Sequence, residues 1–309
     1  MIRIIVIGYG SIGKRHVRLL EEKGHDVGVV SRRDVNVQKH YWNLEDAIEK
    51  QDPHFIVVAN RTSEHSKTLY ELTRLSFTGT ALVEKPLVHS VDAIPTSASY
   101  DIRVAYNFRF HPLLQELRRR VQNQEVVSVD AYAGQYLPSW RPERDYRQTY
   151  SARKSQGGGV LRDLSHEIDY LLWLLGDWKR VAAIGGKFSD LEIDSDDVFM
   201  LLMETSRCPA IVLQLNYLDR EVHRTVRINT LSHTLELDLV ASTLSINGTV
   251  IRNEEVGRDT TYLAQHDALL NNNSEELSTL EDGNRVVRLV EAAEQSAELG
   301  TWIPNKYVN

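Results

Sequence analysis

The chain has 309 residues, a formal charge of -7 at pH 7 and a single cysteine. This length is typical of about two domains, and a composition of 42% hydrophobic and 26% charged residues excludes a disordered or fibrous protein. No apolar run reaches the roughly 18–20 residues that cross a bilayer, and the N-terminal run is too short for a signal peptide. We therefore expect a cytoplasmic protein without disulfides. Its acidic balance excludes nucleic acid and membranes as general partners.

The first third of the chain alternates short apolar runs with amphipathic stretches. β-branched runs predict buried parallel strands at 2–7, 26–30, 55–59 and 81–83, with the run 102–106 expected to close the sheet. Helices are expected at 12–22, where Gly24 provides a C-cap, and at 65–75. This order predicts βαβ units with right-handed crossovers, and therefore a doubly wound α/β sheet.

The pattern changes near residue 120. Alternating apolar and polar residues predict antiparallel strands at 125–135, 179–187, 197–204, 210–217, 225–230 and 234–239, and Asn247-Gly248 predicts a hairpin between 243–246 and 249–251. Helices are expected at 160–175, 259–271 and 284–299. We therefore predict a first domain at 1–120 and an α+β domain with a mostly antiparallel sheet at 121–309, the last helix being a candidate to pack on the first domain.

A glycine-rich turn follows the first predicted strand. Gly8-Tyr9-Gly10-Ser11-Ile12-Gly13 matches G-x-G-x-x-G at the start of a helix. The first glycine permits a tight turn, the second lets the backbone approach a pyrophosphate, and the third allows close helix–strand contact. The sequence therefore predicts a dinucleotide site with contacts from Gly8, Gly10, Ser11, Ile12 and Gly13. The alternative is a tight turn without a ligand.

The residues at the end of the second predicted strand indicate which nicotinamide cofactor the protein prefers. An NAD-preferring site places Asp or Glu there, whereas this chain has Ser31-Arg32-Arg33. A hydroxyl and guanidiniums bind a 2′-phosphate by charge-assisted hydrogen bonds. We expect Ser31, Arg32 and Arg33 to favour NADP(H). The alternative is that these arginines are solvated and that Asp34 serves NAD(H).

Further motifs complete a family resemblance. Val83-Glu84-Lys85-Pro86 ends a strand, Tyr106-Asn107-Phe108-Arg109-Phe110 follows the next one, and Gly157-Gly158-Gly159 precedes Asp163, His166 and Asp169. With the glycine turn and in this order, they resemble the glucose–fructose oxidoreductase/inositol dehydrogenase (Gfo/Idh/MocA) family over nearly the whole chain. The resemblance implies an N-terminal Rossmann domain, an open antiparallel C-terminal sheet, and hydride transfer between a nicotinamide cofactor and a sugar or cyclitol carbon.

The resemblance also implies catalytic roles. Lys85 matches a lysine that contacts the substrate, His166 a histidine that transfers the proton, and Asp163 an aspartate that orients the site. Here Asp163 lies three residues before His166 instead of the usual four, a spacing that still leaves both on one helix face. Asp169 could share the orienting task. An imidazole near its ordinary pKa can accept a hydroxyl proton and return it, and no metal is needed.

Other residues are expected around the ligands. Cofactor contacts are predicted for residues near the carboxyl ends of strands: Asn60, Arg61, Thr62, His65, Glu84, Lys85 and Asn107. For Asn60 to His65 the alternative is a polar cluster at a helix start. His266 is a candidate for the substrate pocket, although partly buried packing is the commoner role of such a histidine.

The substrate is the least defined element. Residues 136–156 form a tyrosine- and arginine-rich stretch that could grip an anionic, ring-containing molecule, and the alternative is a solvated loop or subunit contact. Lys85, Asp163 and His166 are joined as predicted substrate contacts by Arg109, Tyr136, Trp140, Arg141, Arg144 and Tyr146. A phosphorylated, carboxylated or nucleotide-linked sugar of surface-sugar biosynthesis fits these residues.

Alternative functions remain open from the sequence. They are an NAD-dependent inositol or simple aldose dehydrogenase, and a non-catalytic NADP-binding sensor. The resemblance further implies a homo-dimer or homo-tetramer formed through the C-terminal sheet.

Overall fold

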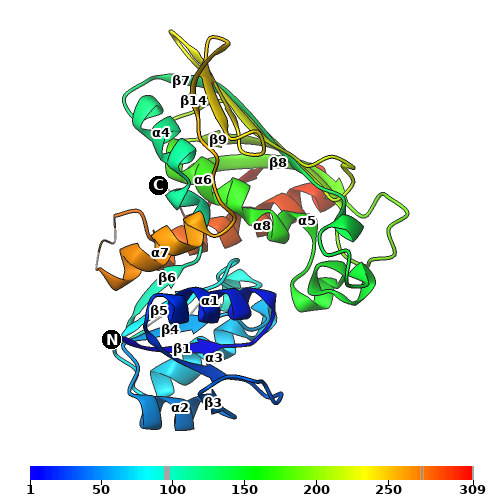
Figure 1. The fold of residues 1–309 in the computed structure, drawn as a ribbon. Helices are drawn as coiled ribbons and strands as arrows, with labels where there is room; N and C mark the ends of the chain where they lie inside the picture. The colour runs from blue at the N-terminus through cyan, green and yellow to red at the C-terminus, as the bar shows by residue number, and fades with distance from the viewer. Residues whose placement is uncertain (94–97, 272, 274, 308–309) are drawn as a thin grey trace. The chain divides into compact units, whose positions relative to one another are not determined.

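Two sheets organise the chain, and each lies in its own unit. The computed structural model describes residues 1–93, 98–271, 273 and 275–307. The first unit comprises Met1–Asn107 and Thr261–Asn284, and the second comprises Phe108–Thr260 and Arg285–Asn309. The chain therefore leaves the first unit, builds most of the second, returns, and leaves again (Figure 1).

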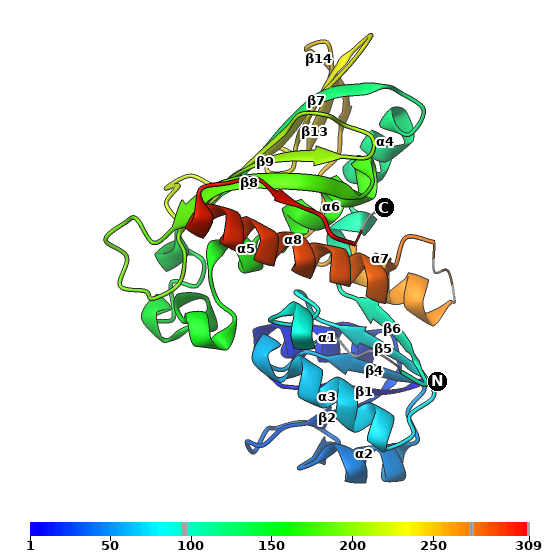
Figure 2. The same cartoon turned by 180° about the vertical axis from the view of Figure 1, so that it is seen from behind.

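The sheet of the first unit is parallel over six strands. Its order is β3-β2-β1-β4-β5-β6, and helices cover both of its sides (Figures 1 and 2). The bounds are β1 Arg3–Ile7, β2 Asp26–Val30, β3 His40–Tyr41, β4 Phe55–Val58, β5 Thr80–Val83 and β6 Asp101–Val104, with helices α1 Ser11–Glu22, α2 Leu44–Gln51 and α3 Thr62–Arg74. In β1, β2, β4 and β5 every residue after the first is buried, as expected for parallel strands covered on both faces. The predicted doubly wound sheet is confirmed.

One predicted sheet edge is wrong. The strand at 102–106 does not close the sheet, because β15 (Ser278–Thr279) pairs antiparallel with β6. This returning segment supplies the hydrogen bonds that an edge strand would otherwise leave to water. Helix α2 has no counterpart in the prediction, although Asn43 caps it by accepting the backbone N–H of Asp46.

The second unit contains a nine-stranded sheet in the order β14-β13-β12-β11-β7-β10-β9-β8-β16. It is antiparallel except between β7 and β10. Asn247 and Gly248 turn the β13–β14 hairpin with φ of 51° and 80°, so the predicted hairpin is confirmed. The bounds are β7 Val126–Gly134, β8 Trp178–Gly186, β9 Val198–Thr205, β10 Ile211–Asn216, β11 His223–Thr230, β12 Thr234–Asp238, β13 Thr243–Ile246, β14 Thr249–Asn253 and β16 Ile303–Pro304.

Beyond residue 107, the described part of the chain contains five α-helices: α4 Pro112–Val121, α5 Val160–Asp163, α6 Ser165–Leu175, α7 Thr260–Leu270 and α8 Leu280–Leu299. The single helix predicted at 160–175 is wrong, because Leu164 interrupts it with φ of -95° and ψ of 27°. At this break Glu167 N–H bonds to the carbonyl of Leu164, a tighter i to i+3 turn. Short 3₁₀ turns occur at Val91–Ala93, Asn107–Phe110, Leu137–Ser139, Tyr146–Gln148, Tyr150–Ala152 and Lys154–Gln156.

Helices cover one face of the nine-stranded sheet. Helix α4 contacts β12 and β13, and α5 contacts β9 and β10. Large apolar side chains on the sheet strands remain exposed, among them Ile184, Met200, Leu202 and Val212. Across the described residues, every helix is too short or too polar to span a membrane.

Helix α4 begins at a histidine cap that is sensitive to acid. Nδ1 of His111 accepts the backbone N–H of Leu113 at 3.3 Å, so the cap requires a neutral ring. Burial lowers the pKa of His111 to about 4, an effect that Glu254 opposes and Arg224 reinforces. The unfolded chain therefore takes up this proton first, and the contribution of His111 to stability is lost as pH falls from about 6.5 towards 4.

We expect His111→Asn to reduce the acid sensitivity of the fold, because asparagine caps helices without titrating. Between pH 7 and pH 5 the linked loss in the native chain is on the order of 2 kcal/mol. The measurement is the urea denaturation midpoint of both proteins at these two pH values. An equal shift of the midpoint in both would contradict the assignment.

Candidate active site

The glycine turn joins the ends of β1 and β4 to the start of α1. Gly8 has φ of +95°, and a Cβ there would lie 2.7 Å from the carbonyl oxygen of Ala59. A Cβ on Gly13 would lie 2.1 Å from the Gly8 carbonyl oxygen, so α1 approaches the turn as closely as only glycine allows. Both glycines are therefore required by the turn itself.

Gly10 differs from these two glycines, and the difference points to a ligand. Its φ is -78°, which any residue adopts, and a Cβ there would have no described heavy atom within 4 Å. Gly10 is also the N-cap of α1 and supplies no side chain to its first N–H groups. Space and unsatisfied donors at a helix start suit an anionic pyrophosphate. The predicted contacts Ser11 and Ile12 are partly exposed on this first turn.

The three residues after β2 have different surroundings. The buried Ser31 hydroxyl accepts the Arg33 backbone N–H at 3.1 Å and so shapes the turn. The Arg32 guanidinium lies 3.3 Å from Glu64. Arg33 and Asp34 are exposed, and Arg33 forms no ion pair within the described ranges. Of the two predicted phosphate-binding arginines, Arg33 is thus the one not engaged by a carboxylate.

Glu84 and Lys85 follow β5 directly. The backbone N–H of Glu84 bonds to the carbonyl of Val58 at 2.9 Å, which holds the turn at the carboxyl end of the sheet, where open parallel sheets bind ligands. Lys85 is half-buried. The Glu84 carboxylate is 2.9 Å from Nε2 of His16.

The remaining predicted cofactor residues of the first unit contact its backbone and helices. His65, on α3, places Nδ1 3.2 Å and 3.1 Å from the carbonyl oxygens of Pro86 and Leu87, and burial lowers its pKa. Asn60 donates to the Thr68 hydroxyl, and Asn107 donates to the Thr261 hydroxyl of α7 at 2.7 Å. Arg61 is the exposed N-cap of α3, and Thr62 is buried in its first turn.

His166, in the second unit, is held by its helix and by an aromatic ring that packs against it. His166 lies in the first turn of α6 and stacks on Phe108, with ring centroids 4.5 Å apart and planes 17° apart. The guanidinium of Arg224 also lies against Phe108, 4.8 Å from the centroid of its ring. Arg224 in turn pairs with the buried Glu167 at 2.8 Å. Neither Phe108 nor Arg224 was among the predicted site residues, because their roles depend on contacts between distant segments.

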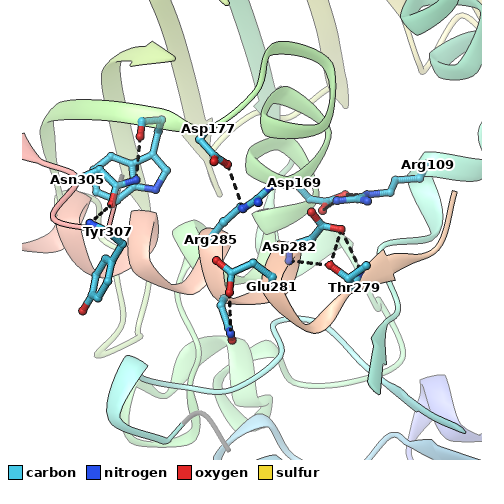
Figure 3. A network of polar contacts seen from close by, with 11 residues as sticks. Arg109, Asp169, Asp177, Thr279, Glu281, Asp282, Arg285, Asn305 and Tyr307 are labelled. Carbon is cyan, nitrogen blue, oxygen red and sulfur yellow. Dashed lines mark hydrogen bonds and ion pairs between the residues drawn. The ribbon is translucent and has the colours of Figure 1, made fainter. Parts of the chain in front are cut away.

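The two candidate orienting aspartates have different partners. The buried Asp163 accepts the Tyr217 hydroxyl at 2.6 Å and a hydrogen bond from Tyr150, whose pKa is raised by burial and by Asp163. Asp169 instead forms a buried bidentate pair with Arg109, at 2.9 Å and 2.7 Å (Figure 3). Arg109, predicted to contact substrate, thus has a carboxylate partner inside this unit.

The tyrosine- and arginine-rich stretch surrounds a small hollow that is open to solvent. Leu137, Thr149 and Ser151 contribute to its lining. The other lining residues are four of the predicted substrate contacts: Trp140, Arg141, Arg144 and Tyr146. Trp140 meets Tyr217 edge to face at 5.2 Å, so this hollow adjoins a tyrosine that binds Asp163. Tyr136 lies under the guanidinium of Arg220. Tyr217 and Arg220 follow the end of β10 and were not among the predicted site residues.

Sequence comparison identifies both halves of the chain. Residues 2–98 match a sequence model described as "Oxidoreductase family, NAD-binding Rossmann fold", and residues 114–230 match the GFO/IDH/MocA C-terminal domain. The chain belongs to the Gfo/Idh/MocA family of oxidoreductases. No curated protein sequence matches it.

Solved Gfo/Idh/MocA-like structures share this fold at low identity. GenD2 from gentamicin A biosynthesis, in complex with NAD, is 22% identical with a TM-score of 0.82, covering 98% of this chain and 96% of that one. The WlbA dehydrogenase from Bordetella pertussis, in complex with NADH and UDP-GlcNAcA, is 17% identical with a TM-score of 0.82 and 99% coverage of both chains. The myo-inositol 2-dehydrogenase from Lactobacillus plantarum is 16% identical with a TM-score of 0.78 and 99% coverage of both.

A pair of glycine variants separates a ligand site from a mere turn in this Gfo/Idh/MocA protein. Gly13→Ala should lower the thermal midpoint, because its Cβ collides with the Gly8 carbonyl. Gly10→Ala should leave the midpoint unchanged yet weaken NADPH binding by about tenfold or more, because the methyl group occupies the space of the pyrophosphate. Unchanged NADPH affinity of the folded Gly10→Ala protein, measured by fluorescence titration, would remove the ligand assignment.

Proposed function

We propose that the protein is an NADP(H)-preferring oxidoreductase acting on a secondary hydroxyl or keto carbon of a sugar-like substrate. The observation that carries this proposal is Lys85 at the carboxyl end of β5, in the same sheet whose β1–α1 turn has the space and donors for a pyrophosphate. Gly8, Gly10 and Gly13 would hold the dinucleotide, which supplies or accepts the hydride when bound.

Lys85 and His166 have different roles at the substrate oxygen. The Lys85 ammonium donates a hydrogen bond to that oxygen and stabilises its developing negative charge. His166 accepts the hydroxyl proton in the oxidative direction and returns it in the reductive one. Nδ1 of His166 is buried, so Nε2 is the nitrogen that exchanges the proton. Stacking on Phe108 fixes the plane of the ring for this transfer.

Asp163 orients the substrate side of the site. Hydrogen bonds from Tyr217 and Tyr150 fix its carboxylate, and Asp169 is engaged by Arg109. We therefore assign the orienting role to Asp163 in preference to Asp169.

An anionic sugar derivative is the substrate class we favour. Arg141 and Arg144 line one hollow with Trp140 and Tyr146, a combination that binds phosphate or carboxylate by charge and a ring by stacking. The WlbA complex contains UDP-GlcNAcA, which supports a nucleotide-linked substrate.

The exposed apolar strand residues support assembly through the second unit's sheet. Ile184, Met200, Leu202 and Val212 come from the neighbouring strands β8, β9 and β10, and contiguous apolar surface of this kind marks protein interfaces. We propose a homo-dimer or homo-tetramer that covers this face.

Turnover tests the catalytic roles and the substrate class together. The chain is assayed with NADP⁺ and UDP-GlcNAcA, myo-inositol or levoglucosan, following formation of the reduced nicotinamide. We expect UDP-GlcNAcA to react fastest. His166→Asn and Lys85→Met should each lower kcat by about 10²-fold or more while NADPH affinity stays within about twofold.

Lys67→Met provides the matched control, since Lys67 is an exposed lysine outside the proposed machinery. Full turnover in the Lys85 or His166 variant would refute its catalytic role. Faster reaction of myo-inositol would favour the inositol dehydrogenase alternative. A protein that binds NADPH but turns over none of the three substrates would favour the sensor alternative.

Arg33 tests the cofactor preference. We expect NADPH to bind the native chain more tightly than NADH, and Arg33→Gln to weaken NADPH by about 10–100-fold, the value of a charged hydrogen bond, with little change for NADH. Arg32→Gln is the comparison, with a smaller effect because Glu64 already engages Arg32. Tighter NADH binding by the native chain, lost in Asp34→Asn, would reverse the assignment.

A further inference from the structure

Three buried histidines of the first unit are linked, directly or through another histidine, to the residues beside Lys85. His16 lies on α1, His65 on α3 and His266 on α7, and each is at most 1% exposed. Fully buried histidines are costly unless their ring nitrogens are hydrogen bonded. Their partners therefore show what they do.

His16 and His266 form a hydrogen-bond chain that ends on Glu84. Nε2 of His16 lies 2.9 Å from Oε1 of Glu84, and Nδ1 of His16 lies 2.8 Å from Nε2 of His266. An ionised Glu84 accepts from His16, so the Nε2 of His16 carries the proton. The Nδ1 of a neutral His16 then accepts, and Nε2 of His266 must donate to it.

This assignment leaves Nδ1 of His266 without a proton. That atom is buried and has no hydrogen-bond partner among the described residues. Burial lowers the pKa of His266 strongly, and His16, Lys23 and His25 act in the same direction. A neutral His266 that donates only through Nε2 is thus the form that its surroundings favour.

Both sides of Lys85 are fixed by this arrangement. On one side, Oε2 of Glu84 accepts the Lys85 backbone N–H at 3.3 Å. On the other, Nδ1 of His65 bonds to the carbonyls of Pro86 and Leu87. The backbone of Lys85 is therefore fixed by a carboxylate on one side and an imidazole on the other, and its flexible side chain starts from a fixed point.

We propose that His16 and His266 are positioning residues for Lys85, acting through the orientation of the Glu84 carboxylate. The inference rests on the proposed role of Lys85 in catalysis. A shift of about 1 Å in a catalytic group can cost about 10²-fold in rate. The hydrogen-bond chain from His266 to Glu84 therefore affects turnover even though neither histidine reaches the substrate in this proposal.

Two substitutions at His266 separate hydrogen bonding from packing. His266→Phe keeps a ring but removes the donor, whereas His266→Gln retains an amide N–H that can donate to His16. The lysines are dimethylated with ¹³C-formaldehyde, and the Lys85 signal is assigned by its loss in Lys85→Arg. We expect His266→Phe to shift or broaden the Lys85 signal, His266→Gln to leave it in place, and the exposed Lys67 to respond to neither.

Kinetics with the substrate that proves active provide the second readout. His266→Phe should lower kcat by about 10–100-fold without changing NADPH affinity, and His266→Gln should recover most of that loss. Equal kcat and an unmoved Lys85 signal in His266→Phe would overturn the proposal. If Lys85→Met kept full turnover, the proposed catalytic role of Lys85 would fail. The NMR signal of Lys85 in His266→Phe would still report whether the hydrogen-bond chain positions Lys85.

The native protein provides a test that does not depend on any variant folding. Long-range ¹H–¹⁵N spectra of the histidine rings should show a proton on Nε2 of both His16 and His266, and none on Nδ1 of His266. A proton on Nδ1 of His266, with none on its Nε2, would contradict this direction of the hydrogen-bond chain.

Discussion

One buried polar contact, between His16 and Glu84, joins two separate elements of the first unit. His16 lies on the helix that begins at the glycine turn, and Glu84 directly precedes Lys85. A hydrogen bond between an imidazole and a carboxylate in a dry interior is strong and directional. It therefore fixes the helix that would receive the dinucleotide against the turn that would receive the substrate, so that both parts of a reaction site share one rigid support.

Much of the fold could be predicted because its signals are local. The β-branched run at Asp26–Val30 and the Asn247-Gly248 turn depend on near neighbours in the chain, and both were placed correctly. The break at Leu164 and the two-residue strand β15 were missed, since each depends on tertiary contacts that leave no periodic pattern. Boundaries chosen by packing cannot be found in a single sequence.

The candidate site shows the same division between local and distant signals. The glycine turn and Glu84-Lys85-Pro86 were recognisable because each is continuous in the chain. The partners of Asp163 and Asp169 were not: Tyr217 is 54 residues from Asp163, and Arg109 is 60 from Asp169. Two aspartates that look alike on one predicted helix face acquire different chemistry, one held by phenols and the other by a guanidinium, only when the chain folds.

The return of residues 261–284 to the first unit has a consequence for biosynthesis. A ribosome releases the six parallel strands early, yet the β15 edge strand and the His266 partner of His16 emerge only after more than 150 further residues. Until then β6 presents an open edge to other nascent chains. The first unit to be synthesised is thus completed late, and its last stabilising contacts are made when the second unit is already largely translated.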